Sequence, residues 1–301
     1  MIIEKVSIIG AGAIGTFYGG KLLKAGINVE FYSKSHATLL NKKKITVKST
    51  WGNFSFKANF YNDVHEMQSP NLIIVCTKSL PHLDINKLIK PICSKGAIIL
   101  LLQNGINQEE KLAKSFSSQV ILGGLAFSCI NRDKPNIINH LDYGHIKVGP
   151  LKKENTKYAK ALSKIFNQAG IECTYNSNLK KLRWHKLLWN IPYNPLSVIL
   201  NTNTKKIMNN KHTANLVKDI MLEVKAIAKS QKVIITIKDI NLMLNNTKKM
   251  SPYNTSMILD YHAHRKMEVD AILGQALRIA KKNKIAVPKI GMLFEQLSFL
   301  S

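Results

Sequence analysis

The sequence predicts an α/β protein in which an N-terminal Rossmann-type, doubly wound sheet is followed by an all-α C-terminal domain. In the first half, short apolar runs rich in β-branched residues alternate with helical stretches, which is typical of such a sheet. Two runs, Leu72–Cys76 and Ala97–Leu102, are apolar throughout, as expected of parallel strands buried on both faces. In the second half, apolar residues recur at helical spacing. A length of 301 residues suits two domains, and we place them at 1–177 and 178–301.

The N-terminal domain is expected to begin with a strand, a glycine-rich turn and a helix. The strand covers Lys5–Ile9, and Gly26 can close the helix that follows the turn. A second strand is expected at Asn28–Tyr32, and residues 45–60 predict a β-hairpin. Shorter strand candidates are Val120–Leu122 and His145–Val148.

Three later segments have apolar residues three and four positions apart, which predicts helices. They cover residues 156–169, 213–229 and 266–280, and Gly170 closes the first of them. Since two of the three lie beyond residue 178, we expect a mostly helical C-terminal domain.

The net charge is unusually high, at +26, because 44 Lys and Arg oppose 18 Asp and Glu. A basic face for nucleic acid is one interpretation. However, 40 of the 44 cations are Lys and only four are Arg, whereas proteins that read nucleic acid favour Arg. The lysines are also spread along the whole chain. We therefore interpret the charge as a compositional bias and expect no nucleic-acid partner.

The sequence also argues against membrane-spanning, secreted, metal-binding and disulfide-linked proteins. No apolar run approaches the roughly 20 residues that span a bilayer, and the start of the chain does not have the pattern of a signal peptide. The four cysteines form no CxxC pair and have no clustered histidines, so we expect neither a metal site nor disulfides. A cytoplasmic protein without a membrane partner is the expectation.

A Gly10-x-Gly12-x-x-Gly15 motif lies between the first strand and the first helix. In this context the first glycine makes the tight turn, the second lets the backbone approach a pyrophosphate, and the third lets helix and strand pack closely. The helix N-terminus offers unpaired N–H groups to the phosphates. We predict a dinucleotide site that includes Ala13 and Ile14, and the competing interpretation is a strand-turn-helix without a ligand.

The end of the second strand bears on the choice of cofactor. Sites for NAD usually have an Asp or Glu there, about 20 residues after the motif, to bind the ribose hydroxyls. Residues 31–36 contain no carboxylate, and Glu30 lies within the strand. Lys34, between two serines, can donate to a 2′-phosphate, which favours NADPH. A solvated Lys34 without a ligand is the alternative.

Lys186, Asn190 and Asn194 are each four residues apart and would line one face of a helix. Apolar residues surround them, and a Lys in apolar surroundings can have its pKa lowered and serve as an acid or base. The two amides could orient a carboxylate or a hydroxyl. From spacing alone, an exposed polar stripe on an amphipathic helix is the favoured interpretation.

The run Lys186–Leu196 (KLLWNIPYNPL) resembles the helical-domain signature of the ketopantoate reductases. Other features of the chain fit the same family, in order and at compatible spacings, so that the resemblance covers essentially the whole chain. They are the early glycine turn, Gln103-Asn104-Gly105 after an apolar strand, Arg265–Asp270 before a glycine-containing helix, and Ile285–Pro288.

This resemblance implies NADPH-dependent reduction of 2-dehydropantoate (ketopantoate) to pantoate, on the route to pantothenate and coenzyme A. It implies that Lys186 donates the proton to the ketone oxygen. It also implies that Glu268 holds the substrate hydroxyl or the nicotinamide ribose and biases the charge of Lys186. A related reductase for another branched 2-keto acid is the alternative within the fold, and a basic nucleic-acid-binding protein is the alternative outside it.

The resemblance assigns further contacts. Asn190 and Asn194 would hold the substrate, Asn104 would face both cofactor and substrate, and Lys78 would approach the cofactor. Ser256 matches a substrate-binding serine, but twelve residues of unbroken helix span about 18 Å, so Ser256 and Glu268 can meet one small ligand only if the chain bends. The family often has an asparagine where this chain has Thr204, beside Asn203. The helical periodicity of the C-terminal half is compatible with a homodimer formed through that half and equally with a monomer that buries these apolar residues in its own core.

Overall fold

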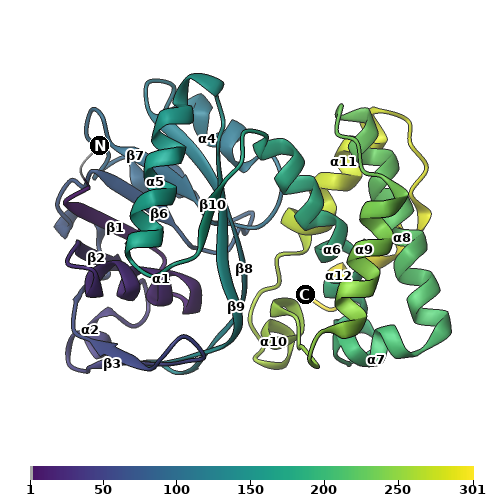
Figure 1. The fold of residues 1–301 in the computed structure, drawn as a ribbon, viewed down its shortest axis with the longest axis horizontal. Coiled ribbons are helices and arrows are strands. Elements are labelled where there is room, and N and C mark those ends of the chain that lie inside the picture. The colour runs from purple at the N-terminus through teal and green to yellow at the C-terminus, as the bar shows by residue number, and fades with distance from the viewer. Residues whose placement is uncertain (1–2) are drawn as a thin grey trace. The chain divides into compact units, whose positions relative to one another are not determined.

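The computed structural model describes residues 3–301, and the chain divides into two compact units (Figure 1). The first, called the sheet unit here, comprises the chain up to Lys78 together with Leu83–Gln103 and Asn107–Leu179. The second, the helical unit, comprises Lys180–Ser301 and two short segments from the first half, Ser79–His82 and Asn104–Ile106. These two segments bring backbone and side-chain groups to the helical unit.

The sheet has ten strands among the described residues, and its middle is parallel. Neighbouring strands run in the order β8-β7-β6-β1-β2-β5, and each pair in this series is parallel. The bounds are β1 Lys5–Ile9, β2 Asn28–Tyr32, β5 Asn59–Tyr61, β6 Leu72–Val75, β7 Ile98–Leu101 and β8 Val120–Lys134. The predicted α/β class with a Rossmann-type sheet is confirmed, and the strand order places the glycine turn after the central β1.

The other side of the sheet is mixed. β8 pairs antiparallel with β9, β9 pairs parallel with β3 and β10, and β3 forms the predicted hairpin with β4. The last part of the predicted hairpin segment instead forms β5, which lies beside β2. The bounds are β3 Ile45–Ser49, β4 Phe54–Phe56, β9 Ile137–Pro150 and β10 Cys173–Tyr175.

Both faces of β6 and β7 are buried, because their runs are apolar at every position. In β6, Leu72 and Ile74 join one core, which α1 and α5 cover, whereas Ile73 and Val75 join the other core, to which α3 and α4 contribute. Figure 1 shows α1 and α5 together on one face of the sheet. The helices and short 3-10 turns of this unit are α1 Ala13–Lys24, α2 Ala37–Asn41, η1 Val64–Glu66, α3 Ile85–Ile89, α4 Gln108–Ser115, η2 Lys153–Asn155 and α5 Thr156–Gln168.

Strands β8 and β9 are much longer than the sequence predicts, at 15 and 14 residues. Only Val120–Leu122 and His145–Val148 were expected, because only there is the apolar pattern clear. Register shifts at Phe127/Ser128 and Cys129/Ile130 mark β-bulges. A bulge interrupts the alternation of buried and exposed residues by which a strand is recognised.

The helical unit surrounds a core of its own, built from apolar residues that include Trp184, Leu188 and Val224. Its helices are α6 Leu179–Ile199, α7 Thr204–Asn209, α8 Lys211–Ser230, α9 Ile237–Lys249, α10 Ser256–His262, α11 Gln275–Lys282 and α12 Pro288–Phe299, with a π-helical turn at Asp270–Gly274. The helix expected over 266–280 therefore begins later, with the π turn. Within residues 3–301, no helix is both long and apolar enough to cross a membrane.

Candidate functional site

The glycine turn after β1 has the geometry that a dinucleotide requires. Gly10 has φ +104°, and a Cβ there would lie 2.7 Å from the Thr77 backbone nitrogen. A Cβ on Gly15 would lie 2.3 Å from the Gly10 carbonyl oxygen, so α1 packs against the turn only without a side chain. A Cβ on Gly12, in contrast, would meet no atom of residues 3–301 within 4 Å. The space at Gly12 is open to a ligand, whereas Gly10 and Gly15 are needed by the fold.

The start of α1 adds the electrostatic part of this turn. Thr16 makes the first helical bond, to the Gly12 carbonyl at 3.0 Å, and the first turn contains no acidic residue. The N–H groups of Ala13 and Ile14, which lie half-buried in that first turn, precede this bond. Such N–H groups at a helix start favour phosphate. The residues present therefore fit a pyrophosphate.

The end of β2 offers cations and hydroxyls without a carboxylate. Glu30 is buried, with 4% of its surface exposed, and its carboxylate pairs with the Lys5 ammonium at 2.7 Å. The Glu30 carboxylate is therefore occupied by an ion pair within the sheet. Lys34 and Ser35 are exposed, and the Ser35 hydroxyl lies 2.8 Å from Nδ1 of His36. Exposed donors at this place suit an extra phosphate better than a pair of ribose hydroxyls.

Glu268 connects three distant parts of the chain within the helical unit. Its Oε1 accepts a hydrogen bond from the Ser79 backbone N–H at 2.8 Å, and its Oε2 accepts one from Asn104 Nδ2 at 2.9 Å. Ser79 and Asn104 follow β6 and β7 closely, and Glu268 directly precedes the helix that continues as the π turn. The structure thus brings together two of the predicted residues, Asn104 and Glu268.

Ser79 was not predicted, and its residue type offers no signal because its main-chain N–H makes the contact. It follows Lys78, which is half-buried and is the last residue of the first segment of the sheet unit. Gln103, the neighbour of Asn104, donates from Nε2 to the Thr77 hydroxyl at 3.1 Å and to the Lys78 carbonyl at 3.4 Å. The segments after β6 and β7 are therefore linked by side-chain hydrogen bonds next to Lys78.

Lys186 lies half-buried on α6, among the apolar residues of the helical core. Its pKa is lowered to about 7, mainly by burial and further by the nearby cation of Arg183, while the carboxylate of Glu268 acts in the opposite direction. A Lys with a pKa near neutrality can both donate and accept a proton at neutral pH, which is the property that general acid–base catalysis needs.

Asn190 and Asn194 lie one and two helical turns after Lys186 on α6, with only 6% and 1% of their surfaces exposed. An exposed polar stripe is therefore the wrong description of this face. The Oδ1 atom of Asn194 is buried and has no hydrogen-bond partner among residues 3–301. A buried acceptor without a partner is costly, so Asn194 is suited to a ligand that supplies a donor.

Ser256 is exposed and begins α10, which ends at His262. His264 then adopts a left-handed conformation with φ +50°, and the Arg265 Nε atom contacts Asp260 Oδ1 at 3.0 Å. The chain turns before Glu268, so the segment is not one long helix. No hydrogen bond joins Ser256 to another predicted residue within the part of the chain that the structure describes.

The position where the family often has an asparagine is occupied by Thr204, which follows the helix-capping residue Asn203. Asn203 caps α7 by accepting a hydrogen bond from the Lys206 N–H at 3.0 Å. Thr204 is fully buried, its N–H donates to the Tyr253 carbonyl, and its hydroxyl has no partner among the described residues.

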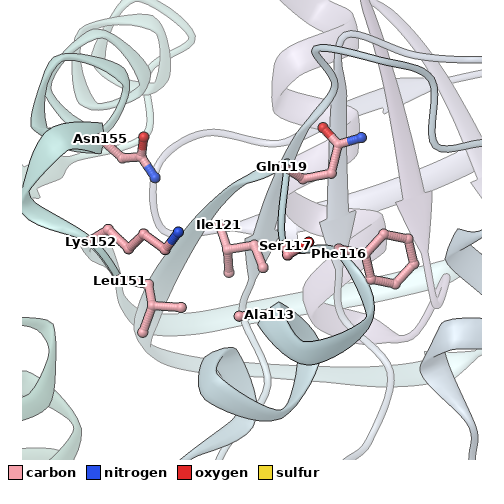
Figure 2. A pocket seen from close by; sticks show the side chains of 8 residues that line it. All are labelled: Ala113, Phe116, Ser117, Gln119, Ile121, Leu151, Lys152 and Asn155. Carbon is pink, nitrogen blue, oxygen red and sulfur yellow. The ribbon is translucent and has the colours of Figure 1, made fainter.

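A small hollow elsewhere in the sheet unit contains none of the predicted residues. Figure 2 shows Lys152 and Asn155 on one side of it and Phe116, Ser117 and Gln119 on the other. Most of the predicted residues instead lie at the glycine turn, at Glu268 and along α6, whereas Lys34 follows β2, Lys78 follows β6 and Ser256 begins α10.

Comparison with protein families identifies the chain. Residues 6–153 match the family model described as ketopantoate reductase PanE/ApbA, and residues 178–301 match the model of its C-terminal part. The chain belongs to the ketopantoate reductase family. The resemblance seen in the Lys186–Leu196 run is thereby confirmed.

Members of this family resemble the chain over its full length. A 2-dehydropantoate 2-reductase of Nostoc sp. is 40% identical, with 99% of this chain and 95% of the relative covered. The crystal structure of 2-dehydropantoate 2-reductase from Geobacter metallireducens GS-15 is 33% identical, covers 99% of this chain and 100% of its own, and gives a TM-score of 0.94. The corresponding structure from Methylococcus capsulatus is 30% identical, covers 98% and 96%, and gives a TM-score of 0.89.

Proposed function

We propose that this ketopantoate reductase family member reduces 2-dehydropantoate to pantoate with NADPH. The observation that carries the chemistry is the half-buried Lys186, whose pKa lies near 7 and responds to Glu268, on the same helix as two buried amides. The identity of the substrate is supported by full-length similarity to the Nostoc enzyme.

In the proposed reaction, Lys186 acts as the general acid. A bound nicotinamide cofactor, proposed to be NADPH, would supply the hydride for the ketone carbon. As the carbonyl π bond breaks, the Lys186 ammonium donates a proton to the oxygen, and the product is a secondary alcohol. Before the proton moves, the positive charge of the ammonium stabilises the developing alkoxide.

Glu268 is proposed to keep Lys186 protonated. Both of its oxygens are held, by the Ser79 N–H and by the Asn104 amide, so its charge is fixed in place. That charge raises the pKa of Lys186 against the effect of burial. Because this carboxylate is already held in position, no free energy is needed to reorient it when the reaction occurs. We propose in addition that Glu268 contacts the cofactor ribose or the substrate hydroxyl.

The substrate is proposed to contact Asn190, Asn194, Asn104 and Ser256. Asn194 has the clearest structural support, because its buried Oδ1 lacks a donor that the hydroxyl of a hydroxy acid could supply. Asn190 lies one helical turn closer to Lys186 on the same face. Ser256 has the least support, since it is exposed and joined to no other predicted residue by a hydrogen bond.

NADPH, rather than NADH, is the proposed cofactor. The turn of Gly10, Gly12 and Gly15, with Ala13 and Ile14, would hold the pyrophosphate. Lys34 would donate to the 2′-phosphate, which is supported by its exposure and by the commitment of Glu30 to Lys5. Lys78 and Asn104 would contact the cofactor near its nicotinamide end.

One steady-state experiment tests this proposal. Oxidation of NADPH and of NADH is followed with 2-dehydropantoate and with a panel of other branched 2-keto acids, and kcat/KM is compared for each pair. We expect the highest value for NADPH with 2-dehydropantoate. A clear preference for another 2-keto acid would overturn the substrate, and a preference for NADH would overturn the cofactor.

A further inference from the structure

Arg132, on β8, contacts the glycine turn from a distant part of the chain. Its Nη2 atom donates to the Thr16 hydroxyl at 2.8 Å and to the Ala11 carbonyl, while Nη1 donates to the Pro135 carbonyl. The Thr16 hydroxyl in turn donates to the Ala11 carbonyl at 3.2 Å. One guanidinium thereby holds the residue between Gly10 and Gly12 together with the first turn of α1.

All three acceptors of Arg132 are neutral. Two other arginines of the chain each pair with a carboxylate: Arg265 with Asp260 at 3.0 Å, and Arg278 with Asp270 at 2.7 Å. Within residues 3–301, Arg132 forms no ion pair. It is half-buried, and burial lowers its pKa to about 10. Hydrogen bonds to neutral oxygens compensate the burial of such a cation only in part, and an anion from outside the chain would stabilise it further.

We propose that Arg132 is a positioning residue for the cofactor, and that it provides the counter-charge for the phosphates at the glycine turn. This inference rests on the proposed use of a nicotinamide dinucleotide. The guanidinium donates a hydrogen bond to the Ala11 carbonyl and so offsets the partial negative charge of this oxygen within the turn. The same contact places a positive charge beside the open position at Gly12, where the backbone alone supplies only partial charges.

An arginine is required here rather than one of the abundant lysines. Its planar group reaches the Pro135 carbonyl through one nitrogen and the Ala11 and Thr16 oxygens through the other. A Lys ammonium is a compact point charge and cannot hold such a separated set in one geometry. The conservative Arg132→Lys variant would therefore retain the charge but lose part of the positioning.

The test measures direct binding of NADPH by fluorescence titration at two salt concentrations, without any keto acid, together with kcat at saturating cofactor. In Arg132→Gln we expect the Kd of NADPH to rise about tenfold and to depend less on salt, because a charge near the phosphates is lost. Arg132→Lys should recover part of the affinity. The kcat of both variants should stay within about threefold of the unmodified protein, since the proton donor is untouched.

Lys134→Gln is the matched control, because it removes one exposed positive charge from the same strand. It should change the Kd by less than about twofold. Thr16→Val provides a second variant that keeps the cation but removes its hydroxyl acceptor, and about threefold weaker binding is expected. Melting temperatures without cofactor distinguish loss of folding from loss of binding.

Two results would overturn the inference. One is an Arg132→Gln protein that is folded and binds NADPH within about twofold of the unmodified protein; the other is an equal loss of affinity in Lys134→Gln. Because the titration contains no keto acid, it reports on Arg132 even if 2-dehydropantoate is not the substrate. If the unmodified protein binds neither NADPH nor NADH, this inference and the proposed cofactor both fail.

Discussion

Asn104 donates a hydrogen bond to the carboxylate of Glu268 at 2.9 Å across 164 residues of chain. The other oxygen of that carboxylate accepts from the Ser79 N–H, so its position is determined from two sides. Because Glu268 raises the pKa of Lys186, this arrangement links two segments of the first half of the chain to the charge of the proposed proton donor.

Neutralising Glu268 should lower the pKa of Lys186. In Glu268→Gln, the opposing effects of burial and Arg183 remain, so the pH at which the reduction rate falls should move to lower values. We expect a loss of at least about tenfold in kcat/KM at pH 8. The measurement is a pH profile of kcat/KM. Asp270→Asn is the matched control, because Asp270 pairs with Arg278 and its loss should leave the profile in place.

The rate of reduction should itself follow the titration of Lys186. A proton donor is active only when protonated, so activity should be present below its pKa of about 7 and lost as pH rises through it. Above that value, kcat/KM for reduction should fall about tenfold per pH unit, and the reverse oxidation of pantoate should rise over the same range. A reduction rate that stays level up to pH 9 would contradict this role.

Removal of the Lys186 ammonium should affect chemistry more than binding. In Lys186→Met, which keeps the length of the apolar stem, kcat should fall by roughly 10²–10⁴-fold. The Kd of NADPH should change little, as a fluorescence titration would show. Equal losses in kcat and in cofactor affinity would indicate a structural role instead.

Lys34 should determine the preference between the two cofactors. In Lys34→Ala, the Kd of NADPH should rise about tenfold and that of NADH should stay constant, because only NADPH has the 2′-phosphate. Lys57→Ala, which removes another exposed lysine of the sheet unit, should alter neither. Parallel losses for NADPH and NADH would place Lys34 away from the 2′-phosphate.

Alanine substitutions at two glycines of the turn should affect different properties, stability in one case and cofactor binding in the other. A Cβ on Gly15 would lie 2.3 Å from the Gly10 carbonyl, so Gly15→Ala should lower stability, by about 2 kcal/mol or more. A Cβ on Gly12 meets no protein atom within 4 Å, so Gly12→Ala should melt like the unmodified protein but bind NADPH more weakly. Thermal unfolding and NADPH titration of both variants check this pair, and a Gly12→Ala protein with full affinity would refute the assignment.

Local sequence patterns predicted β6 and β7 because continuous apolar runs mark strands buried on both faces. Strands β1 and β2 begin and end where the sequence places them. Strands β8 and β9 were underestimated because bulges interrupt the alternation on which recognition depends. The late start of the helix after Glu268 has a similar origin, since helical spacing of apolar residues does not show where the chain turns.

The sequence by itself determined that Lys186, Asn190 and Asn194 share one face of a helix, because that relationship depends only on 3.6 residues per turn. Asn104 and Glu268 could be named only through resemblance to a family, and Ser79 could not be named at all. Tertiary structure alone decided that Glu268 is held from two sides, that the pKa of Lys186 falls to about 7, and that Arg132 reaches the glycine turn. Each of these depends on burial or on contacts between distant residues, which local periodicity does not encode.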